Sequence, residues 1–500
     1  MAARLASLAP LAALAIALAG CTTVGPDFKP PAPPTGAADY AMAGETRAAI
    51  VRLDPDARTA GPWWAAFRSE ALDRTVRMAL AESPDVAAAQ ATLERYQAEA
   101  LEAGAELGPQ LEATANVQRQ KFNSRAFGFR RSADGTPSPF SGSRVFNLFS
   151  VGGRVSYDLD LFGGGRRRVE EARARVDQAA READAAYLAL SGNVALQAFR
   201  VAELRGQIQA LETIVEDDRI LLGLARKALD IGGIPRTTLT GIEAQLAEDE
   251  AALPPLRRQY DAARHQLALL VGRSPADWTP PDFDLGAFVV PAQVPVSLPS
   301  DLVRRRPDIL AAEAEAHAAT AAIGARMAEQ YPSLRLSANG ALSGLSPDEV
   351  FDTQSTGYTL LSGLTAPLFD GGARKARTRA AEAEAKLAVA NYRRTVLKAF
   401  REVSDAMAAL RTDEEEVATL TRAVAHSQRV ADDTLAAAQL GARTAADVVQ
   451  SRRQLSFDRR RLAEARGRQL ADLVALYAAS AADWRTAQAS GDADGGRTGR

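Results

Sequence analysis

Few residues in this chain have the types and spacing that chemistry requires. It has three histidines and one cysteine, so counting excludes a cysteine-rich zinc site, a disulfide framework and a multi-histidine metal centre. His265, His317 and His426 fall in separate predicted helices, without a serine or metal motif beside them. The glycines of Leu161–Arg166 follow a predicted strand and precede a predicted helix, as in a phosphate loop, but the Lys-Ser/Thr ending is missing. The sequence therefore predicts a protein that is not an enzyme and needs no cofactor or metal.

The single cysteine lies where a secretory signal would be cut. A basic start and a short apolar run over Leu5–Leu18 are followed by small residues and Cys21, which is typical of a signal peptide over residues 1–20. The junction resembles a bacterial lipobox, which implies that Cys21 is lipidated and becomes the mature N-terminus. The alternative is an ordinary signal peptide with an incidental cysteine. Because Thr22 rather than Asp follows, the resemblance to bacterial lipoproteins implies an outer-membrane location. Closely spaced prolines then predict an extended tether over residues 21–62.

Composition narrows the class of protein further. The 500 residues include 60 Lys and Arg against 62 Asp and Glu, so no basic field favours nucleic acid as a partner. Hydrophobic residues make up 47% and charged residues 24%, which are values of a folded chain. Aromatic residues are only 6%, which favours long helices over an aromatic-rich sandwich core.

An internal duplication organises the chain. Phe162 is matched by Phe369, 207 residues later, and Gly233 by Gly441, 208 residues later. The segments at Pro109 and Pro332 also match but are 223 residues apart, so the first copy contains a longer connection.

These matches divide the chain into segments. The two copies span residues 63–272 and 301–484, and a proline-rich linker over 273–300 joins them. The extra connection of the first copy lies around 122–144, where we expect an extracellular loop. The tail 485–500 is expected to be disordered.

Each copy combines two amphipathic strands with one very long helix. Proline-free runs of helix formers over 166–231 and 374–440 would each be about 100 Å long at 1.5 Å per residue. Apolar and polar residues alternate over 109–119, 147–161, 332–342 and 356–368, as in strands with two different faces. Shorter helical runs cover 73–104, 236–271 with a break at Pro254–Pro255, 301–330 and 444–480.

Four such strands are too few to close a barrel in a membrane. Transmembrane barrels begin at about eight strands, and an open edge in lipid leaves backbone groups unpaired. Three chains would supply twelve strands, so the pattern predicts a homotrimer with a shared barrel. The alternative is a soluble sheet with one side packed on helices. In the barrel, a polar set would line a wet lumen (Glu112, Asn116, Arg154, Asp158, Arg335) and an apolar set would face lipid (Leu111, Val117, Val155, Leu159, Leu336).

Several motifs resemble those of the TolC/OprM family of outer-membrane efflux lipoproteins, in its NodT-type branch. The stretch Cys21–Phe28 is similar to the mature N-terminus of the family, and Trp63–Phe67 to its next block. The most specific match is Val303–Ile309, which contains the signature Arg305, Arg306, Pro307 and Asp308, followed by Tyr331–Leu334. Considered without the family, the same arginines could be a solvated helix start with Pro307 in its first turn.

The resemblance implies an α+β membrane protein. Its long antiparallel helices would form a trimeric periplasmic α-barrel, and its four strands would contribute to a shared twelve-stranded outer-membrane β-barrel. The implied function is passive conduction of substrates from an inner-membrane RND transporter and a periplasmic adaptor across the periplasm and outer membrane. The chain would be surrounded by outer-membrane lipid and anchored through Cys21. A periplasmic adaptor lipoprotein is the alternative, but an adaptor would have one helical hairpin flanked by compact β domains.

The resemblance also places a gate at the helix turns. The turns around Gly232–Gly233 and Gly441 would be the periplasmic tips, with Asp447 in a ring of carboxylates and Arg443 in a gating network. Some family members have a second acidic residue at the position of Gln450, which is absent here. The alternative is that Asp447 only complements the dipole of a helix in its first turn.

Overall fold

The computed structural model describes residues 23–33, 39–40, 51–53, 62–123, 143–352 and 355–480. The chain divides into two compact units: unit 1 comprises Met1–Pro30, Glu94–Asp177 and Ala314–Val389, and unit 2 comprises Pro31–Leu93, Gln178–Glu313 and Ala390–Arg500. Among the described helices, none has a stretch long and apolar enough to cross a membrane. The expected signal peptide, Cys21 and the tail 485–500 lie outside the described residues.

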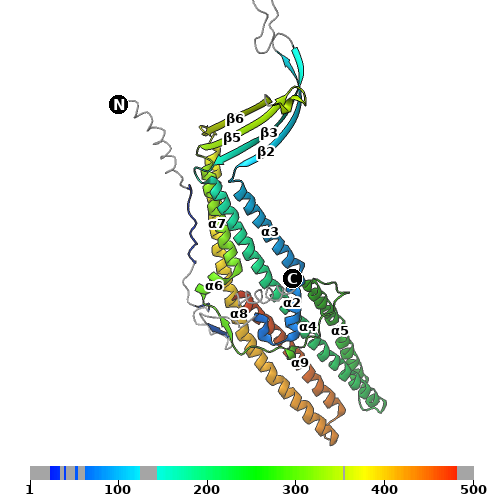
Figure 1. The fold of residues 1–500 in the computed structure, drawn as a ribbon. Coiled ribbons are helices and arrows are strands. Elements are labelled where there is room, and N and C mark those ends of the chain that lie inside the picture. The colour runs from blue at the N-terminus through cyan, green and yellow to red at the C-terminus, as the bar shows by residue number, and fades with distance from the viewer. Residues whose placement is uncertain are drawn as a thin grey trace, which may run out of the picture. The chain divides into compact units, whose positions relative to one another are not determined.

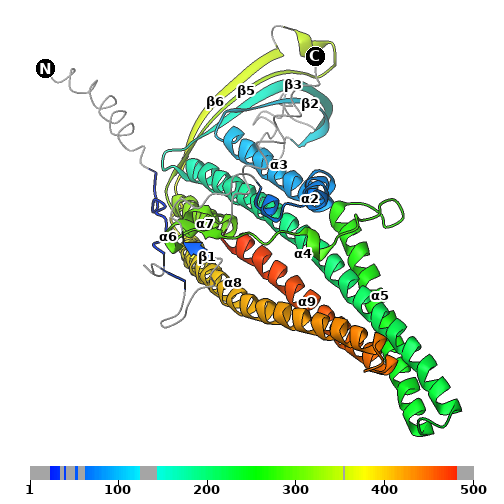
Figure 2. The same ribbon diagram turned by 90° about the horizontal axis from the view of Figure 1, so that it is seen from below.

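Unit 1 contains one four-stranded antiparallel sheet in the order β2-β3-β5-β6. Its strands lie side by side and follow one curve (Figures 1 and 2). Their bounds are Gln110–Asn123 for β2, Ser143–Leu159 for β3, Ser333–Gly344 for β5 and Thr356–Thr365 for β6. The β2–β3 ladder continues to Asn123 opposite Ser143, so the connection is shorter than the loop expected over 122–144. Sequence alternation missed this extension because Arg119 and Lys121 fall on the same side of the strand as Leu111, which ends the polar–apolar pattern.

The two long helices are α4, Gly164–Asp230, and α8, Ala373–Gln439, each of 67 residues. Their ends lie within two residues of the expected ends. A carboxylate caps each N-terminus: Asp160 accepts from the backbone N–H groups of Gly165 and Arg166, at 3.0 and 2.8 Å. Asp370 accepts from those of Gly372 and Arg374, at 2.9 and 3.1 Å. These caps satisfy amides that a helix N-terminus leaves without partners.

The helix expected over 236–271 is not broken. Helix α5 runs from Arg236 to Val271 through both Pro254 and Pro255. The prolines remove backbone donors, but α5 is held to α4 on both sides of them, by Glu250 with Arg219 at 2.8 Å and by Arg257 with Glu212 at 2.7 Å. Beyond the prolines, Ala263, Leu267 and Val271 of α5 are buried in the core, and this burial favours a helix that continues past them.

Two expected helical runs are each two helices. The run 73–104 is α2, Glu70–Glu82, and α3, Pro84–Ala105, and the run 301–330 is α6, Pro299–Arg305, and α7, Pro307–Ala328. In both cases the second helix begins at a proline, which disfavours the helical conformation in the residue before it. The last helix, α9, spans Ala445–Ala479.

The expected tether and linker are partly ordered. β1, Val51–Leu53, pairs in parallel with β4, Val294–Val296, and short 3-10 turns lie at Trp63–Phe67, Leu285–Ala287 and Glu349–Phe351. Tyr40 ties the same region together, because its hydroxyl donates to Ser297 O at 2.9 Å and its carbonyl accepts from Ser404 Oγ at 2.8 Å. Strands of three residues are too short to show periodicity, so no sequence pattern predicts them.

The core of unit 2 is aromatic. Trp63 and Phe67 are fully buried, with Trp63 against Tyr477 at 5.5 Å between ring centroids and Phe67 against Phe199 at 4.9 Å. The indole N–H of Trp63 donates to Ser191 Oγ at 3.2 Å, which satisfies its buried polar atom. The Trp63–Phe67 block that resembles the efflux family is therefore a core element.

Candidate functional site

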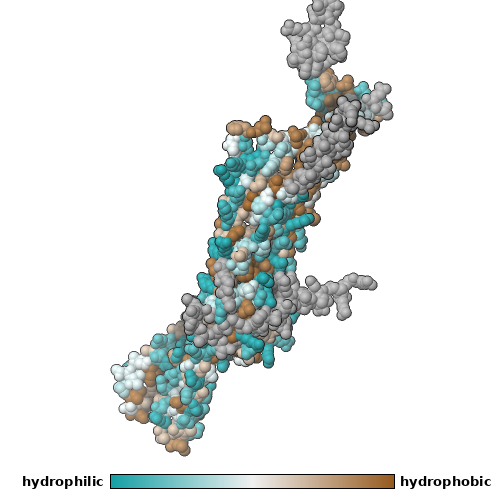
Figure 3. Space-filling model, turned by 90° about the vertical axis from the view of Figure 1, so that its left-hand side faces the viewer, coloured by the Kyte–Doolittle hydropathy of each residue, from teal (hydrophilic) through white to brown (hydrophobic). Residues whose placement is uncertain are grey.

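The sheet of unit 1 has one continuous apolar face. The register places Leu111, Val155, Ala338 and Leu360 in one row across all four strands. Leu111 and Leu360 are 77% and 73% exposed, so no helix of the chain's described residues covers this row. Large apolar side chains reach the surface beside polar ones in Figure 3. The expected apolar set thus shares one face, and the soluble-sheet alternative, which needs that face covered by helices, is wrong for the described chain.

The opposite face is polar and internally paired. Arg335 on β5 donates to both carboxylate oxygens of Asp158 on β3, at 2.6 and 2.8 Å. Arg154 donates to Asn339 Oδ1 at 3.3 Å, and Glu112 occupies the same row on β2. In the rows that β2 to β6 share, this face has no large apolar side chain except Leu361, which lies in the row of Gln110, Ser156 and Ser337. Two such unlike faces suit a sheet with lipid on one side and water on the other.

Both edges of this sheet are open. Among the described residues, β2 pairs only with β3, and β6 pairs only with β5. Each edge strand therefore presents a row of backbone donors and acceptors that a further strand can satisfy.

The glycine turn before α4 is not a phosphate cradle. The N–H groups of Gly165 and Arg166, which an anion would need, already donate to Asp160. Within the described chain no group of three or more metal-ligating side chains comes together. His317 contacts Glu170 Oε1 at 3.0 Å, while His265 and His426 are exposed on other helices. The described histidines thus do not share a site.

Two helical hairpins in unit 2 end in glycine turns. α5 returns alongside α4, and α9 alongside α8 (Figure 1). The turns contain Gly232 at φ 71° and Gly441 at φ 76°, left-handed conformations that glycine adopts without strain.

Asp447 and Arg443 lie just past the second turn. Asp447 is in the first turn of α9 and forms a capping box with Thr444, whose backbone N–H and hydroxyl both donate to Asp447 Oδ2 at 2.9 Å. These bonds, with Arg443 nearby, lower the pKa of the Asp447 carboxyl below its ordinary value. Asp447 is half-buried, and it lies in the first turn of α9 as the alternative to a gate requires.

A buried charge cluster joins the two hairpins behind these turns. Asp217 and Asp218 of α4 are buried and face Arg452 and Arg453 of α9, at 3.2 and 3.3 Å. Arg453 also contacts Asp249 of α5, and burial together with Asp249 raises the pKa of Asp218 to about 6. Sequence reasoning missed this cluster. The adjacent Asp-Asp and Arg-Arg pairs within helices were the available signal, but nothing in the sequence links them across the two copies.

The signature residues build a buried ion pair. Arg306 precedes α7, and its guanidinium donates to Asp308 at 2.8 and 3.0 Å, to Ala479 O at 3.1 Å and to Glu402. Pro307 is the first residue of α7, as expected, and Arg305 ends α6. The alternative of a solvated helix start is wrong for Arg306, which is buried because three elements of unit 2 meet around it.

Comparisons with known proteins agree with this geometry. The profile of the family described as outer membrane efflux protein matches residues 75–273 and 298–482. The pyoverdine export outer membrane protein OpmQ of Pseudomonas putida is 29% identical over 473 residues, covering 94% of this chain and 96% of OpmQ. The outer membrane protein OprJ of Pseudomonas aeruginosa is 32% identical over 435 residues, covering 84% of each.

Solved structures show the same fold. The Campylobacter jejuni CmeC outer membrane channel superposes with a TM-score of 0.81 at 17% identity, covering 94% of this chain and 98% of CmeC. The adaptor alternative finds no support among these relatives. Its expected single hairpin is also absent, because the described chain has two hairpins and a four-stranded sheet. On the profile match and the relationship to OprJ, this chain belongs to the outer membrane efflux protein family.

Proposed function

We propose that the chain is the outer-membrane channel of a tripartite efflux system. Three copies would form a twelve-stranded β-barrel in the outer membrane and an α-barrel in the periplasm. A periplasmic adaptor would join the helix turns to an inner-membrane RND transporter, and substrates would pass without chemical change. Cys21 would carry the lipid anchor, and the segments 63–272 and 301–484 would be the two repeats of the conduit.

The observation that carries this proposal is the sheet with two open edges and two unlike faces. In lipid, each unpaired backbone group costs several kcal/mol, so an isolated four-stranded sheet is unstable there. Pairing β6 of one copy with β2 of the next removes every edge when the ring closes. The Asp158–Arg335 pair then faces the lumen, and Leu111 and Leu360 face lipid.

The long helices support a conduit through the periplasm. At 1.5 Å per residue, a helix of 67 residues spans about 100 Å, several times the length of an ordinary helix. Such helices need partners along their whole length, and neighbouring copies would supply them.

Neighbouring residues on opposite faces of β6 provide a test. Leu360→Arg places a charge on the proposed lipid face, at a cost of about 2–4 kcal/mol per residue at the bilayer midplane, while Thr359→Arg places the same charge on the lumen face. We expect Leu360→Arg to abolish trimers in outer-membrane fractions and Thr359→Arg to leave them intact. Equal assembly of the two variants would contradict the proposed orientation of the sheet.

Imaging of detergent-extracted protein, together with a mass determination, tests the assembly directly. A three-fold cylinder is the expected particle. Two results together would refute the channel: the particle is a compact monomer, and the protein does not protect drug-susceptible cells when it is expressed with its pump and adaptor.

The gate is proposed at Asp447 and Arg443, where three copies would bring three carboxylates toward one axis. Because Asp447 also caps α9, its loss has two effects. Thr444→Ala separates them, since it removes the hydroxyl that accepts from the Asp447 N–H but keeps the charge. We expect Asp447→Asn and Arg443→Ala to raise the leak conductance of single channels in planar bilayers, and Thr444→Ala to leave it near wild type. Equal conductance in all four proteins would rule out a charge gate at this turn.

A further inference from the structure

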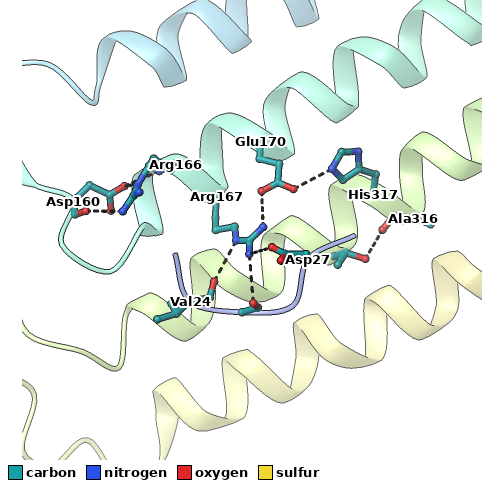
Figure 4. Close-up of polar contacts among 10 residues, drawn as sticks. Val24, Asp27, Asp160, Arg166, Arg167, Glu170, Ala316 and His317 are labelled. Carbon is teal, nitrogen blue, oxygen red and sulfur yellow. Dashed lines mark hydrogen bonds and ion pairs between the residues drawn. The ribbon is translucent and has the colours of Figure 1, made fainter. Parts of the chain in front are cut away.

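The stretch Thr23–Phe28 lies in a fitted groove of unit 1, beside the turn between β3 and α4. The backbone N–H of Val24 donates to Phe162 O at 3.0 Å, in the manner of a ladder bond. Arg167, on the first turn of α4, reaches over the segment, and its Nε donates to Val24 O at 3.2 Å. Figure 4 shows the guanidinium surrounded by Val24, Asp27 and Glu170.

Arg167 is the centre of the groove. Its side chain is only 4% exposed, and its Nη2 donates to Asp27 Oδ1 at 2.8 Å and to Gly25 O at 3.4 Å. From the other side, Glu170 accepts from Nη1 at 2.7 Å. Three of the four acceptors of this buried cation therefore belong to the N-terminal segment, and a buried cation without them is strongly unfavourable.

Glu170 extends the groove to α7. Its second oxygen contacts His317 Nε2 at 3.0 Å, and the ring of Phe28 stacks on His317 with 4.5 Å between centroids and 13° between planes. Backbone, charge and aromatic contacts thus fix successive residues of the segment.

Glycines give the groove its depth. A Cβ on Gly324 would lie 2.7 Å from Val24 O and 2.8 Å from Arg167 Cγ, and a Cβ on Gly163 would lie 2.8 Å from Thr23 Cα. Gly25, at φ 96°, lies so close that its own Cβ would meet Gly324 Cα at 2.5 Å. Backbone packs directly on backbone here, which only glycine permits.

The second copy of the duplication provides an internal comparison. At the turn between β6 and α8, Gly371 and Gly372 have no atom within 4 Å of where a Cβ would be placed. Leu368 and Phe369 beside them are 96% and 93% exposed. At the first turn the matching Gly164 and Gly165 are crowded by Ala328 and Leu107, and Gly163 by Thr23. The second turn is therefore open, whereas the first is packed both by its own unit and by the N-terminal segment.

From the contacts of Arg167, His317 and Gly324 we infer that the Arg167–Gly324 groove is a docking site for the chain's own mature N-terminus, and that it fixes where the acyl chains of Cys21 enter the membrane. The inference rests on the proposed lipidation of Cys21. Cys21 lies three positions before Val24, a reach of at most about 11 Å, so the lipid would start beside the stacked rings of Phe162 and Tyr331. Aromatic rings at such a junction are favoured at the membrane–water interface, so anchor and sheet would be held at one depth.

The docking part is tested by the motion of a spin label at Lys29, an exposed position next to the groove. The label is placed on Lys29→Cys in the full-length protein in outer-membrane vesicles, after Cys21 is found acylated by mass spectrometry of the mature chain. We expect an immobilised spectral component that is lost with Gly324→Ala and with Arg167→Gln. Gly104→Ala is the matched control, since it is also a helical glycine of unit 1 but has nothing within 4 Å. Equal immobilisation in Gly324→Ala and Gly104→Ala would overturn the docking site.

The position of the lipid is tested by photo-crosslinking. Cells are supplied with palmitate carrying a diazirine near its carboxyl end, and adducts are mapped by mass spectrometry. We expect adducts on the peptides containing Phe162 and Tyr331 in wild type and their loss in Gly324→Ala, with Gly104→Ala unchanged. Wild-type adducts only at other positions would refute the inference. If Cys21 were found unmodified, the proposed lipid anchor would be refuted instead. The spin-label experiment would then be done in a Cys21→Ser background, so that only position 29 is labelled, and it would still test the docking site.

Discussion

The internal pairing of β3 with β5 predicts how neighbouring copies pair in the proposed barrel. In a duplicated chain, β6 corresponds to β3 and β2 corresponds to β5, so the contact between β6 of one copy and β2 of the next repeats a contact that already exists. Gly153 opposes Gly340 in the chain. The repeat offsets of 207 and 223 residues convert this pair into Leu360 of one copy opposite Val117 of its neighbour. Residues that oppose each other in a sheet must lie on the same face. The pairing within the chain places both Leu360 and Val117 on the apolar face, so the inferred pair meets this condition.

The expected distances make the register measurable. Directly opposed Cβ atoms lie about 4.5–5.5 Å apart, close to the 3.5–4.5 Å of a disulfide, whereas a slip of two residues adds about 7 Å along the strand. Leu360→Cys with Val117→Cys should therefore join neighbouring copies under mild oxidation. Tyr358→Cys and Ser362→Cys, each combined with Val117→Cys, test the registers two residues away on either side.

Non-reducing gel electrophoresis of outer-membrane fractions is the assay. The Leu360–Val117 pair should give covalent dimers and trimers that disappear on reduction, and neither single cysteine should give them. Registers shifted by two residues are the relevant competitors, because the two hairpins of the chain already differ by two residues. Leu111 opposes Val155 in the first hairpin. The equivalent of Leu111, Leu334, opposes Leu364 rather than Ser362, the equivalent of Val155. Preferential linking through Ser362 or Tyr358 would refute the equivalence of the two contacts.

Three further predictions concern unit 2. Arg306→Met should lower the free energy of unfolding by about 3 kcal/mol, because it leaves Glu402 and Asp308 without their shared cation. The control Arg304→Met, at an exposed position, should change it by less than about 0.5 kcal/mol. Urea unfolding of the detergent-solubilised protein measures both variants. Burial and the neighbouring Asp472 raise the pKa of Asp413 to about 7. The native state therefore holds a proton that the unfolded chain releases above about pH 4. The free energy of unfolding should fall as the pH rises from about 4 to about 7. Asp413→Asn should flatten that fall and unfold at higher urea than wild type at pH 8, and an unchanged pH profile would contradict the raised pKa. Thr444→Ala should cost about 1 kcal/mol and speed hydrogen exchange in the first turn of α9 about fivefold; exchange at the wild-type rate would show that the capping box does not stabilise this turn.

The elements that sequence predicts well are those with long local patterns. The two 67-residue helices follow from long proline-free runs of helix formers, and the strands from alternation that continues over ten or more residues. The error at Pro254–Pro255 has a non-local cause, because the local signal is opposed by the burial of Leu267 and Val271 later in α5. β1 and β4 are too short to carry any pattern.

The site features that sequence missed depend on residues far apart in the chain. Arg453 and Asp218 come from different copies of the duplication, and Arg167 and Asp27 are 140 residues apart. No local periodicity connects such pairs, because the fold alone decides which helix faces meet. The family resemblance located Arg306 and Asp308, but only the structure shows that they form a buried ion pair with Glu402.

The contacts of Tyr40 constrain the order in which parts of the chain fold. Its partners Ser297 and Ser404 follow it by 257 and 364 residues, which makes these among the most non-local contacts in the fold. A secreted chain leaves the translocation channel N-terminus first, whereas non-local contacts form only after the intervening chain has closed its loop. In the proposed secreted chain, residues before Tyr40 would reach the periplasm first, well before Arg167, Ser297 and Ser404 emerge. That interval would leave the N-terminal segment accessible to the proposed processing and acylation before Arg167 binds it.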